Sequence, residues 1–396
     1  MSIFKNRDSL SPNFPIEKHW NNIPHRNDQL SLLWNFHEDI IEKRGESFLR
    51  RLQIIGPAGS GKTCTLKFFG DNFEVKAKKN RINLDHIYIN LKLEGGRKVI
   101  LYRSLLRKLD PNLVSTSYSA GEMLRIFIDF LQESGRHVLL TIDEIDYYVK
   151  HFRDEGVVYD LTRLNELTLG RPCGVVGIIF LAREKAFHDL LDVAELSSLG
   201  RNYIELKPYT SNQIFDILER RAKEAFNLGT YSSEVLELIS DITASPIING
   251  DMRYALDLLL YSGNLAVNQG SSLILPEHVR KVYGETYHLI TTEDIQHLPR
   301  KDKIVLLGIV RALMSKRSSY TSLKEIKTMV GVICEEYGLK PIKDVDECVQ
   351  DLCDRNIIDL KSLLQIGISG VSTTDLESYL NNILKRLEND IYERGN

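Results

Sequence analysis

Long apolar runs are missing from this sequence of 396 residues. Its longest uninterrupted apolar stretches, such as residues 175–182 and 304–310, are far shorter than the roughly 20 residues that a membrane-spanning helix needs. The N-terminal residues also lack the apolar segment of a secretion signal. We therefore expect no membrane helix, no membrane partner and a chain that stays in the cytoplasm.

Cysteine and proline are scarce as well. The 5 cysteines are odd in number and show no C-x-x-C or Cys/His spacing, so the sequence predicts neither a disulfide framework nor a zinc site. Only 11 prolines, with 43% hydrophobic and 27% charged residues, exclude a disordered chain. The 51 basic and 54 acidic residues nearly cancel to a net charge of −3, so basic clusters have to be sought region by region.

Apolar runs without polar alternation predict strands buried on both faces at residues 51–55, 138–142 and 175–181. Amphipathic segments between them predict helices, and the alternation indicates an α/β domain with a parallel sheet at residues 1–206. Helical periodicity alone follows over residues 207–292, which predicts a small helical domain. Three further helices and a hairpin predict a winged helix over residues 293–396.

One motif reads G-x-x-x-x-G-K-T between a predicted strand and a predicted helix, and it comprises Gly56, Pro57, Ala58, Gly59, Ser60, Gly61, Lys62 and Thr63. Glycines allow backbone N–H groups to surround phosphates, and the lysine ammonium reaches the outer phosphates. The Thr63 hydroxyl is then a ligand for Mg²⁺. This pattern predicts a P-loop for ATP or ADP.

A second motif places two carboxylates at the end of an apolar strand. Asp143 and Glu144 follow the run at residues 138–142. In a P-loop protein, Asp143 is expected to hold Mg²⁺, while Glu144 orients and polarises the attacking water. The two motifs together predict an ATPase with an AAA+ core.

A further candidate lies in the predicted helical domain. Asp251 fits the N-cap of a helix that contains Arg253 in its first turn. We expect Arg253 to point towards the γ-phosphate and to couple this domain to the nucleotide state. The alternative is a surface arginine paired with Asp257 at the i,i+4 spacing.

The order of these elements resembles the archaeal replication initiators, AAA+ ATPases related to the largest subunit of the origin recognition complex. The resemblance covers essentially the whole chain. It rests above all on the segments GDMRYALDLL, from residue 250, and YTSL, from residue 320, together with the Pro-His-Arg turn and IDEID. It implies an AAA+ domain, a helical lid and a C-terminal winged helix. It also assigns base contacts to Pro24, His25 and Arg26. Cys64 and Tyr209 complete the candidate nucleotide contacts.

The resemblance further implies a helical insertion that contacts DNA, expected at about residues 95–121. Its basic residues are Arg97, Lys98, Arg103, Arg107 and Lys108. A solvated helix face explains the same cluster equally well, so both interpretations stay open.

Two departures from the family pattern predict weak ATP hydrolysis. The family closes its fourth strand with an asparagine, where we assign Phe180, which cannot hydrogen-bond a phosphate. The family also offers an arginine to a neighbouring subunit before a Ser-Ser-Leu, but here residues 194–196 read Ala-Glu-Leu and only Arg201 could substitute.

In the winged helix, basic charge gathers on the first two predicted helices, whereas the expected recognition helix at residues 344–355 is acidic. Carboxylates repel phosphates, so strong sequence readout by this domain alone is not expected. The groups that remain able to face DNA are Lys343, Gln350, Arg355, Asn356 and Lys361.

The leading hypothesis is therefore an ATP-dependent initiator that binds double-stranded origin DNA in the nucleoid and helps to control or recruit the replicative helicase. An alternative is an initiator paralogue or repressor that needs a sister initiator for tight binding. A clamp-loader-like ATPase would end in a helical collar, which the predicted hairpin disfavours.

Overall fold

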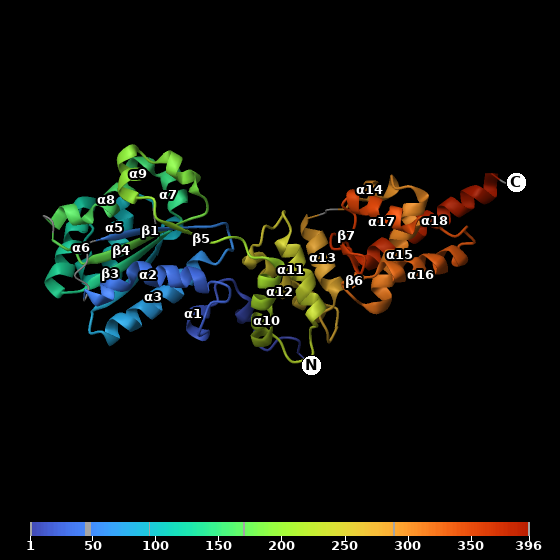
Figure 1. Ribbon diagram of the computed structural model, residues 1–396, viewed down its shortest axis with the longest axis horizontal. Helices are drawn as coiled ribbons and strands as arrows, with labels where there is room; N and C mark the ends of the chain where they lie inside the picture. The colour runs from blue at the N-terminus through green and yellow to red at the C-terminus, as the bar shows by residue number, and fades with distance from the viewer. Residues whose placement is uncertain (1, 44–48, 95, 169–170, 288–289, 395–396) are drawn as a thin grey trace. The chain divides into compact units, whose positions relative to one another are not determined.

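The computed structural model describes residues 2–43, 49–94, 96–168, 171–287 and 290–394 (Figure 1). The chain divides into two compact units. One unit comprises residues 15–209, and the other comprises residues 2–14 together with the chain from residue 210 onward.

The first unit contains a five-stranded parallel sheet in the order β2-β3-β4-β1-β5. Its strands are β1 (Arg50–Ile55), β2 (Leu84–Asn90), β3 (His137–Asp143), β4 (Val175–Ala182) and β5 (Tyr203–Glu205). Alternate residues of β4 enter two separate cores, with Ile178 and Phe180 on one side and Ile179 and Leu181 on the other. The predicted parallel sheet, buried on both faces, is confirmed.

Helices cover both faces of this sheet (Figure 1). The α-helices are α1 (Ile16–His19), α2 (Asn27–Glu42), α3 (Lys62–Lys79), α4 (Leu91–Glu94), α5 (Lys98–Leu109), α6 (Ala120–Ser134), α7 (Ile145–His151), α8 (Val157–Thr162) and α9 (Val193–Leu199). Short 3-10 turns are η2 (Pro111–Leu113), η3 (Arg153–Glu155), η4 (Leu164–Thr168) and η5 (Lys185–Leu190). The predicted insertion region thus contains α5 and η2, after β2.

The second unit contains the lid helices α10 (Ser211–Ala225), α11 (Ser233–Ala244), α12 (Met252–Asn268) and α13 (Pro276–Tyr287). The N-terminal segment, with η1 (Arg7–Leu10), packs on this lid rather than on the sheet domain to which the sequence analysis assigned it. The Lys5 amide donates to the Ala225 carbonyl at 2.8 Å, and the Arg221 guanidinium donates to the Ser11 carbonyl at 2.6 Å.

The remainder of the second unit is a winged helix, as predicted. Its elements are α14 (Thr292–Gln296), α15 (Arg300–Lys316), β6 (Tyr320–Thr321), α16 (Leu323–Glu336), α17 (Val345–Asp354), β7 (Asp359–Ser362), β8 (Gln365–Gly367) and α18 (Thr373–Arg394). The strands form an antiparallel sheet in the order β6-β8-β7. The sequence analysis did not locate α18, whose Leu376, Leu380 and Leu384 complete the core of this domain.

Candidate nucleotide-binding site and DNA interface

The predicted P-loop connects β1 to α3 at the carboxyl edge of the sheet. Gly59 and Gly61 have φ values of 66° and 85°, a left-handed region that glycine adopts without steric cost. A Cβ atom on Gly56 would lie 2.4 Å from the Leu206 carbonyl oxygen, so a larger residue would force the loop apart. The loop therefore has the tight glycine turn and helix N-terminus that a phosphate cradle requires.

The Lys62 ammonium lies within this loop. It donates to the carbonyl oxygens of Gly56 at 2.6 Å and Pro57 at 2.9 Å. These contacts keep the positive charge at the turn, where the outer phosphates of a nucleotide would lie.

The two predicted metal ligands are in direct contact. The Thr63 hydroxyl donates to Oδ2 of the buried Asp143 at 2.7 Å, across the gap between α3 and the end of β3. A hydroxyl and a carboxylate are the oxygen ligands that Mg²⁺ prefers in P-loop proteins, so this pair fits the ion.

Tyr88 is a member of this site that the sequence analysis missed. Its hydroxyl donates to the same Oδ2 of Asp143 at 2.6 Å, while Oδ1 accepts from the Glu144 amide at 2.8 Å. Burial, and then the charge of Asp143, raise the pKa of Tyr88, so its hydroxyl stays a donor. Tyr88 lies near the end of β2, and the structure shows that this strand pairs with β3. The sequence alone does not specify that pairing, so it could not place Tyr88 beside Asp143.

Glu144 follows β3 in a left-handed conformation, with φ 59° and ψ 40°, which is costly for a residue with a Cβ atom. Its carboxylate oxygens Oε1 and Oε2 both accept from Nη2 of Arg183, at 3.2 and 3.0 Å. Hydrogen bonding to Glu144 raises the pKa of Arg183. The candidate base is therefore held in an ion pair.

This geometry corrects the assignment of Phe180 as the residue that closes the fourth strand. Phe180 is fully buried within β4, opposite Ile142 of β3, because the apolar run continues to Ala182. Arg183 is the first residue after the strand. The group that follows β4 at the carboxyl edge of the sheet, beside the P-loop, is therefore the Arg183 guanidinium and not the phenyl ring of Phe180.

Arg26 and Tyr209 brace the P-loop from the side. The buried Arg26 guanidinium donates to the Ser60 carbonyl at 2.7 Å and to the Lys207 carbonyl at 3.1 Å, and it lies 3.9 Å from the centre of the Tyr209 ring. Burial lowers the pKa of Arg26. A Cβ atom on Gly61 would lie 2.6 Å from the Tyr209 hydroxyl, so this ring lies against the loop.

The other candidate nucleotide contacts lie beside these groups. Pro24 and His25 directly precede Arg26, and His25 has a φ of 57°. Cys64 lies half-buried in the first turn of α3. Their predicted contacts with a base or phosphate stay predictions.

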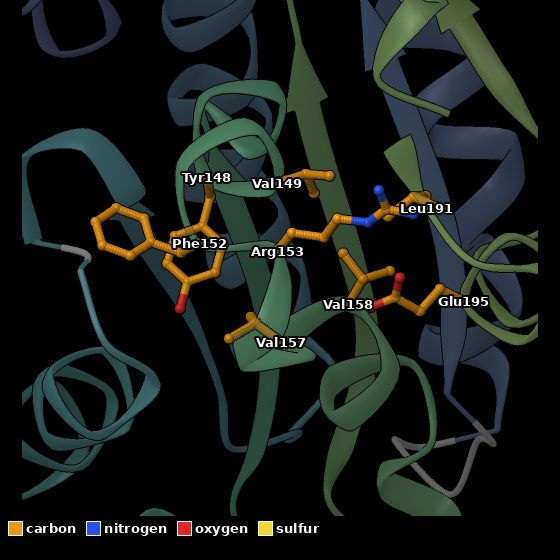
Figure 2. Close-up of a pocket in the computed structure, with 8 residues that line it drawn as sticks. All are labelled: Tyr148, Val149, Phe152, Arg153, Val157, Val158, Leu191 and Glu195. Carbon is orange, nitrogen blue, oxygen red and sulfur yellow. The ribbon is translucent and has the colours of Figure 1, made fainter. Parts of the chain in front are cut away.

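A separate small pocket contains none of the P-loop residues in its lining (Figure 2). It is lined by Tyr148, Val149, Phe152, Arg153, Val157, Val158, Leu191 and Glu195. Glu195 is buried there because its side chain caps α9, where Oε2 accepts from the Asp192 amide at 3.2 Å. The segment at residues 194–196, which lacks the expected arginine, therefore has a structural role in α9.

Arg253 lies in the first turn of α12, as predicted, and Oδ1 of the N-cap Asp251 accepts from the Arg253 amide at 2.9 Å. Its side chain is exposed, and no ion pair with Asp257 occurs in the part of the chain that the structure describes. Its approach to a γ-phosphate stays a prediction.

The basic residues of α5 fall into two groups. Lys98 lies 3.5 Å from Asp160 and Lys108 lies 2.9 Å from Glu94, so acidic neighbours partly neutralise both. Arg97 and Arg107 are exposed, and Nε of Arg103 is buried without a hydrogen-bond partner among the described residues.

Acidic residues at the start of α17 neutralise two lysines from other helices. Asp344 pairs with Lys301 at 2.6 Å, and Asp346 pairs with Lys327 at 2.8 Å. Within α17, Asp351 pairs with Arg355 at 2.7 Å.

The remaining predicted DNA contacts differ in their surroundings. Lys343 and Asn356 are exposed, whereas Gln350 donates to Asp354 at 2.8 Å. In the wing, Lys361 forms an ion pair with Asp241 of the lid helix α11, which neutralises the charge of this lysine. Contact with DNA stays a prediction for all of these residues.

The fold and the phosphate-edge site define a P-loop ATPase of the AAA+ class with a lid and a winged helix. Residues 50–191 match the family described as AAA domain, and residues 215–284 match the Cdc6 AAA+ ATPase-type lid domain. This membership implies nucleotide binding.

Comparison with curated proteins identifies the family. The chain is 32% identical to ORC1-type DNA replication protein 1 of Archaeoglobus fulgidus, over 86% of this chain and 79% of the relative. It is 29% identical to the ORC1-type DNA replication protein of Pyrococcus furiosus, over 91% of this chain and 83% of the relative. The chain belongs to the archaeal Orc1/Cdc6 family of replication proteins, as the sequence predicted.

Solved structures agree with this assignment. The crystal structure of Cdc6p from Pyrobaculum aerophilum superposes with a TM-score of 0.79 at 25% identity, over 97% of this chain and 99% of the other. The Aeropyrum pernix ORC1 protein in complex with DNA gives a TM-score of 0.61 at 24% identity, over 96% and 97% of the two chains, which shows the shared fold.

Proposed function

We propose that this protein is an ATP-dependent, DNA-binding replication initiator that recognises replication origins. The observation that carries the proposal is the contact between Thr63 and Asp143 beside a complete P-loop, in a chain of the Orc1/Cdc6 family that ends in a winged helix. The Aeropyrum pernix ORC1 protein, which shares this fold, has a structure in complex with DNA, which supports the DNA-binding part of the proposal.

The nucleotide site is proposed to hold ATP or ADP with Mg²⁺. Thr63 and Asp143 hold the ion, which neutralises charge on the phosphates when it is bound. The P-loop amides and Lys62 bind the phosphates, Tyr88 fixes the orientation of Asp143, and Arg26 keeps the loop in its tight turn. Glu144 orients the attacking water and takes its proton.

Arg253 in the lid is proposed to make this unit sensitive to the γ-phosphate. The lid and the winged helix share one compact unit and are joined by buried hydrogen bonds, such as that from Arg280 to the Ile368 carbonyl at 2.7 Å. A change at the lid therefore reaches the winged helix through these contacts. A paralogous initiator and the replicative helicase are the proposed partners.

A second candidate function is a paralogue or repressor that binds DNA tightly only with a sister initiator. The ion pairs of α17 with Lys301 and Lys327 favour it, because they leave fewer cations of the winged helix for phosphates.

A footprint on the replication origins of the source genome tests both candidates. We expect protection of origin DNA that is stronger with ATP than without nucleotide. Protection by the protein alone supports an initiator, and protection only with a paralogue present supports the second function. Equal protection of random and origin DNA under all conditions contradicts both.

A further inference from the structure

Three carboxylates gather where β3 ends and α7 begins. Asp143, Glu144 and Asp146 lie within four consecutive positions, next to the P-loop. Burial, and to a lesser extent the charge of Glu144, raise the pKa of Asp146, while the hydrogen bond from the Arg183 amide lowers it. Arg183 is the cation that the structure places against this acidic cluster.

The backbone fixes the position of Arg183 on both sides. The Arg183 amide donates to Oδ2 of Asp146 at 3.3 Å, which connects the end of β4 to α7. On the other side, the Gly56 amide donates to the Ala182 carbonyl at 3.2 Å, which connects the same strand end to the P-loop. Arg183 therefore lies between the phosphate cradle and the acidic cluster.

The side chain of Arg183 is directed at Glu144 alone among these carboxylates. One nitrogen, Nη2, donates to both carboxylate oxygens. Glu144 is mostly buried, with 16% of its side chain exposed, while 48% of Arg183 is exposed. The left-handed backbone of Glu144 limits the directions that its carboxylate can take, so the pair fixes the carboxylate on the guanidinium.

We propose that Arg183 is a positioning residue that restrains Glu144 and slows ATP hydrolysis until the ion pair opens. This inference deepens the proposed function and rests on its nucleotide site.

The restraint acts on one step of the reaction. The water oxygen forms a bond to the γ-phosphorus while the bond to the bridging oxygen breaks, and the electron pair of that bond leaves with ADP. The proton of the water passes to Glu144. In the structure both oxygens of Glu144 accept from Arg183. Opening of the pair frees the carboxylate to turn towards this water.

The first test measures single-turnover hydrolysis of Mg-ATP by the full chain. We expect Arg183→Ala to raise the rate by about 2- to 5-fold, the range that a half-exposed ion pair can supply. Arg183→Lys, which keeps the charge, should give a smaller increase. The matched control is Arg136→Ala, because Arg136 pairs with Asp85 at 2.5 Å at the opposite edge of the same sheet. It should leave the rate unchanged.

The second test needs neither nucleotide nor DNA. The free energy of unfolding is measured for Arg183→Ala, Glu144→Gln and the double variant. Because the two side chains form an ion pair, we expect that the two losses of stability are not additive. Additive effects would overturn the inference. This cycle depends neither on hydrolysis nor on origin binding. Its result can therefore be interpreted even if the proposed function is wrong.

The third test measures the affinity of the protein for nucleotides. If Arg183 restrains Glu144, titration calorimetry should show that Arg183→Ala changes the affinities for ADP and for a non-hydrolysable ATP analogue by similar factors. A loss of more than about 10-fold for the ATP analogue alone, with slower hydrolysis, would show that Arg183 contacts the γ-phosphate instead. That result, or an unchanged rate, would overturn the inference.

Discussion

Asp143 shows how one side chain organises the nucleotide site. Its two oxygens accept from the Thr63 hydroxyl, the Tyr88 hydroxyl and the Glu144 amide. These bonds come from three different elements, so they fix the carboxylate before any ligand binds. Such preorganisation lowers the cost of ordering the site when Mg²⁺ and a nucleotide bind.

At the same scale, Lys62→Ala should abolish retention of nucleotide. The variant leaves the outer phosphates facing only backbone amides, because the ammonium that lies in the loop is lost. Nucleotide extracted from the purified protein and fluorescence titration with labelled ADP both measure this loss. Lys78→Ala, which removes an exposed lysine near the end of the same helix, is the control. Full occupancy of Lys62→Ala would contradict the site assignment.

Two histidines, the buried His37 and the half-buried His86, make the first unit sensitive to acid. Burial lowers the pKa of His37 and of His86 to about 4, from 6.5. Between pH 6.5 and 4 the unfolded chain takes up protons that the folded chain does not, so stability is complete above pH 6.5 and decreases as the pH falls. We expect a loss of roughly 2 kcal/mol per histidine at pH 5.

Thermal unfolding at pH 7 and pH 5 checks this expectation. The His37→Phe variant should lose less stability on acidification than the native chain, since its aromatic neighbours Phe69 and Phe73 can accommodate a ring that does not titrate. His151→Gln, at an exposed position, is the control. An identical acid response in His37→Phe would refute the role of His37.

At the scale of elements, the sequence predicts what periodicity and motifs encode. The apolar runs identify β1, β3 and β4, and the glycine and carboxylate motifs place the P-loop and Asp143 at their ends. The pairing of Glu144 with Arg183 depends on the register between β3 and β4, which no local pattern specifies. The end of β4 is misplaced for a different reason: the apolar run continues to Ala182, so no polar residue marks the strand end near Phe180.

Contacts between the lid and the winged helix are also invisible in the sequence. The buried Arg280 of α13 donates to the carbonyl oxygens of Ile368, Ser318 and Ser319. Asp241 of α11 accepts from the Tyr320 hydroxyl and pairs with Lys361. These residues are up to about 120 positions apart, so only the folded chain brings them together.

We expect Arg280→Ala to loosen the winged helix from the lid. The variant leaves three buried carbonyl groups without their donor, at a cost on the order of 3 kcal/mol. Limited proteolysis should then release the winged helix faster, and the unfolding transition of this unit should move to lower temperature. The control is Arg300→Ala, at an exposed position of α15. Equal protease resistance of the two variants would show that Arg280 does not hold the two domains.

At the scale of the whole molecule, the distribution of charge determines how strongly the protein binds DNA phosphates. The first two helices of the winged helix are rich in basic residues. However, Lys301, Lys327 and Lys361 of this domain already form ion pairs with carboxylates of the same chain. Internal pairs release no counterions from DNA, so this domain alone has a limited electrostatic grip. A neighbouring initiator that adds cations would therefore raise the affinity for an origin.

The last prediction concerns the salt dependence of this grip. If the chain neutralises about four to six phosphates, log K against log salt should fall with a slope of roughly −4 to −5. Substitution of Arg103 and Arg107 by alanine should flatten this slope by up to about 2 and leave sequence preference unchanged, because phosphate contacts position the protein but do not specify a sequence. Fluorescence anisotropy with origin and random duplexes at several salt concentrations measures both quantities.

The matched control uses the paired lysines of the same helix. Lys98 and Lys108 already face Asp160 and Glu94, so their joint substitution by alanine should change the slope less than loss of the two arginines. Addition of a paralogue should raise the affinity for origin DNA above that for random DNA. Salt-insensitive, nanomolar binding by the protein alone would contradict the limited grip, and equal slopes for the two double variants would exclude Arg103 and Arg107 from the interface.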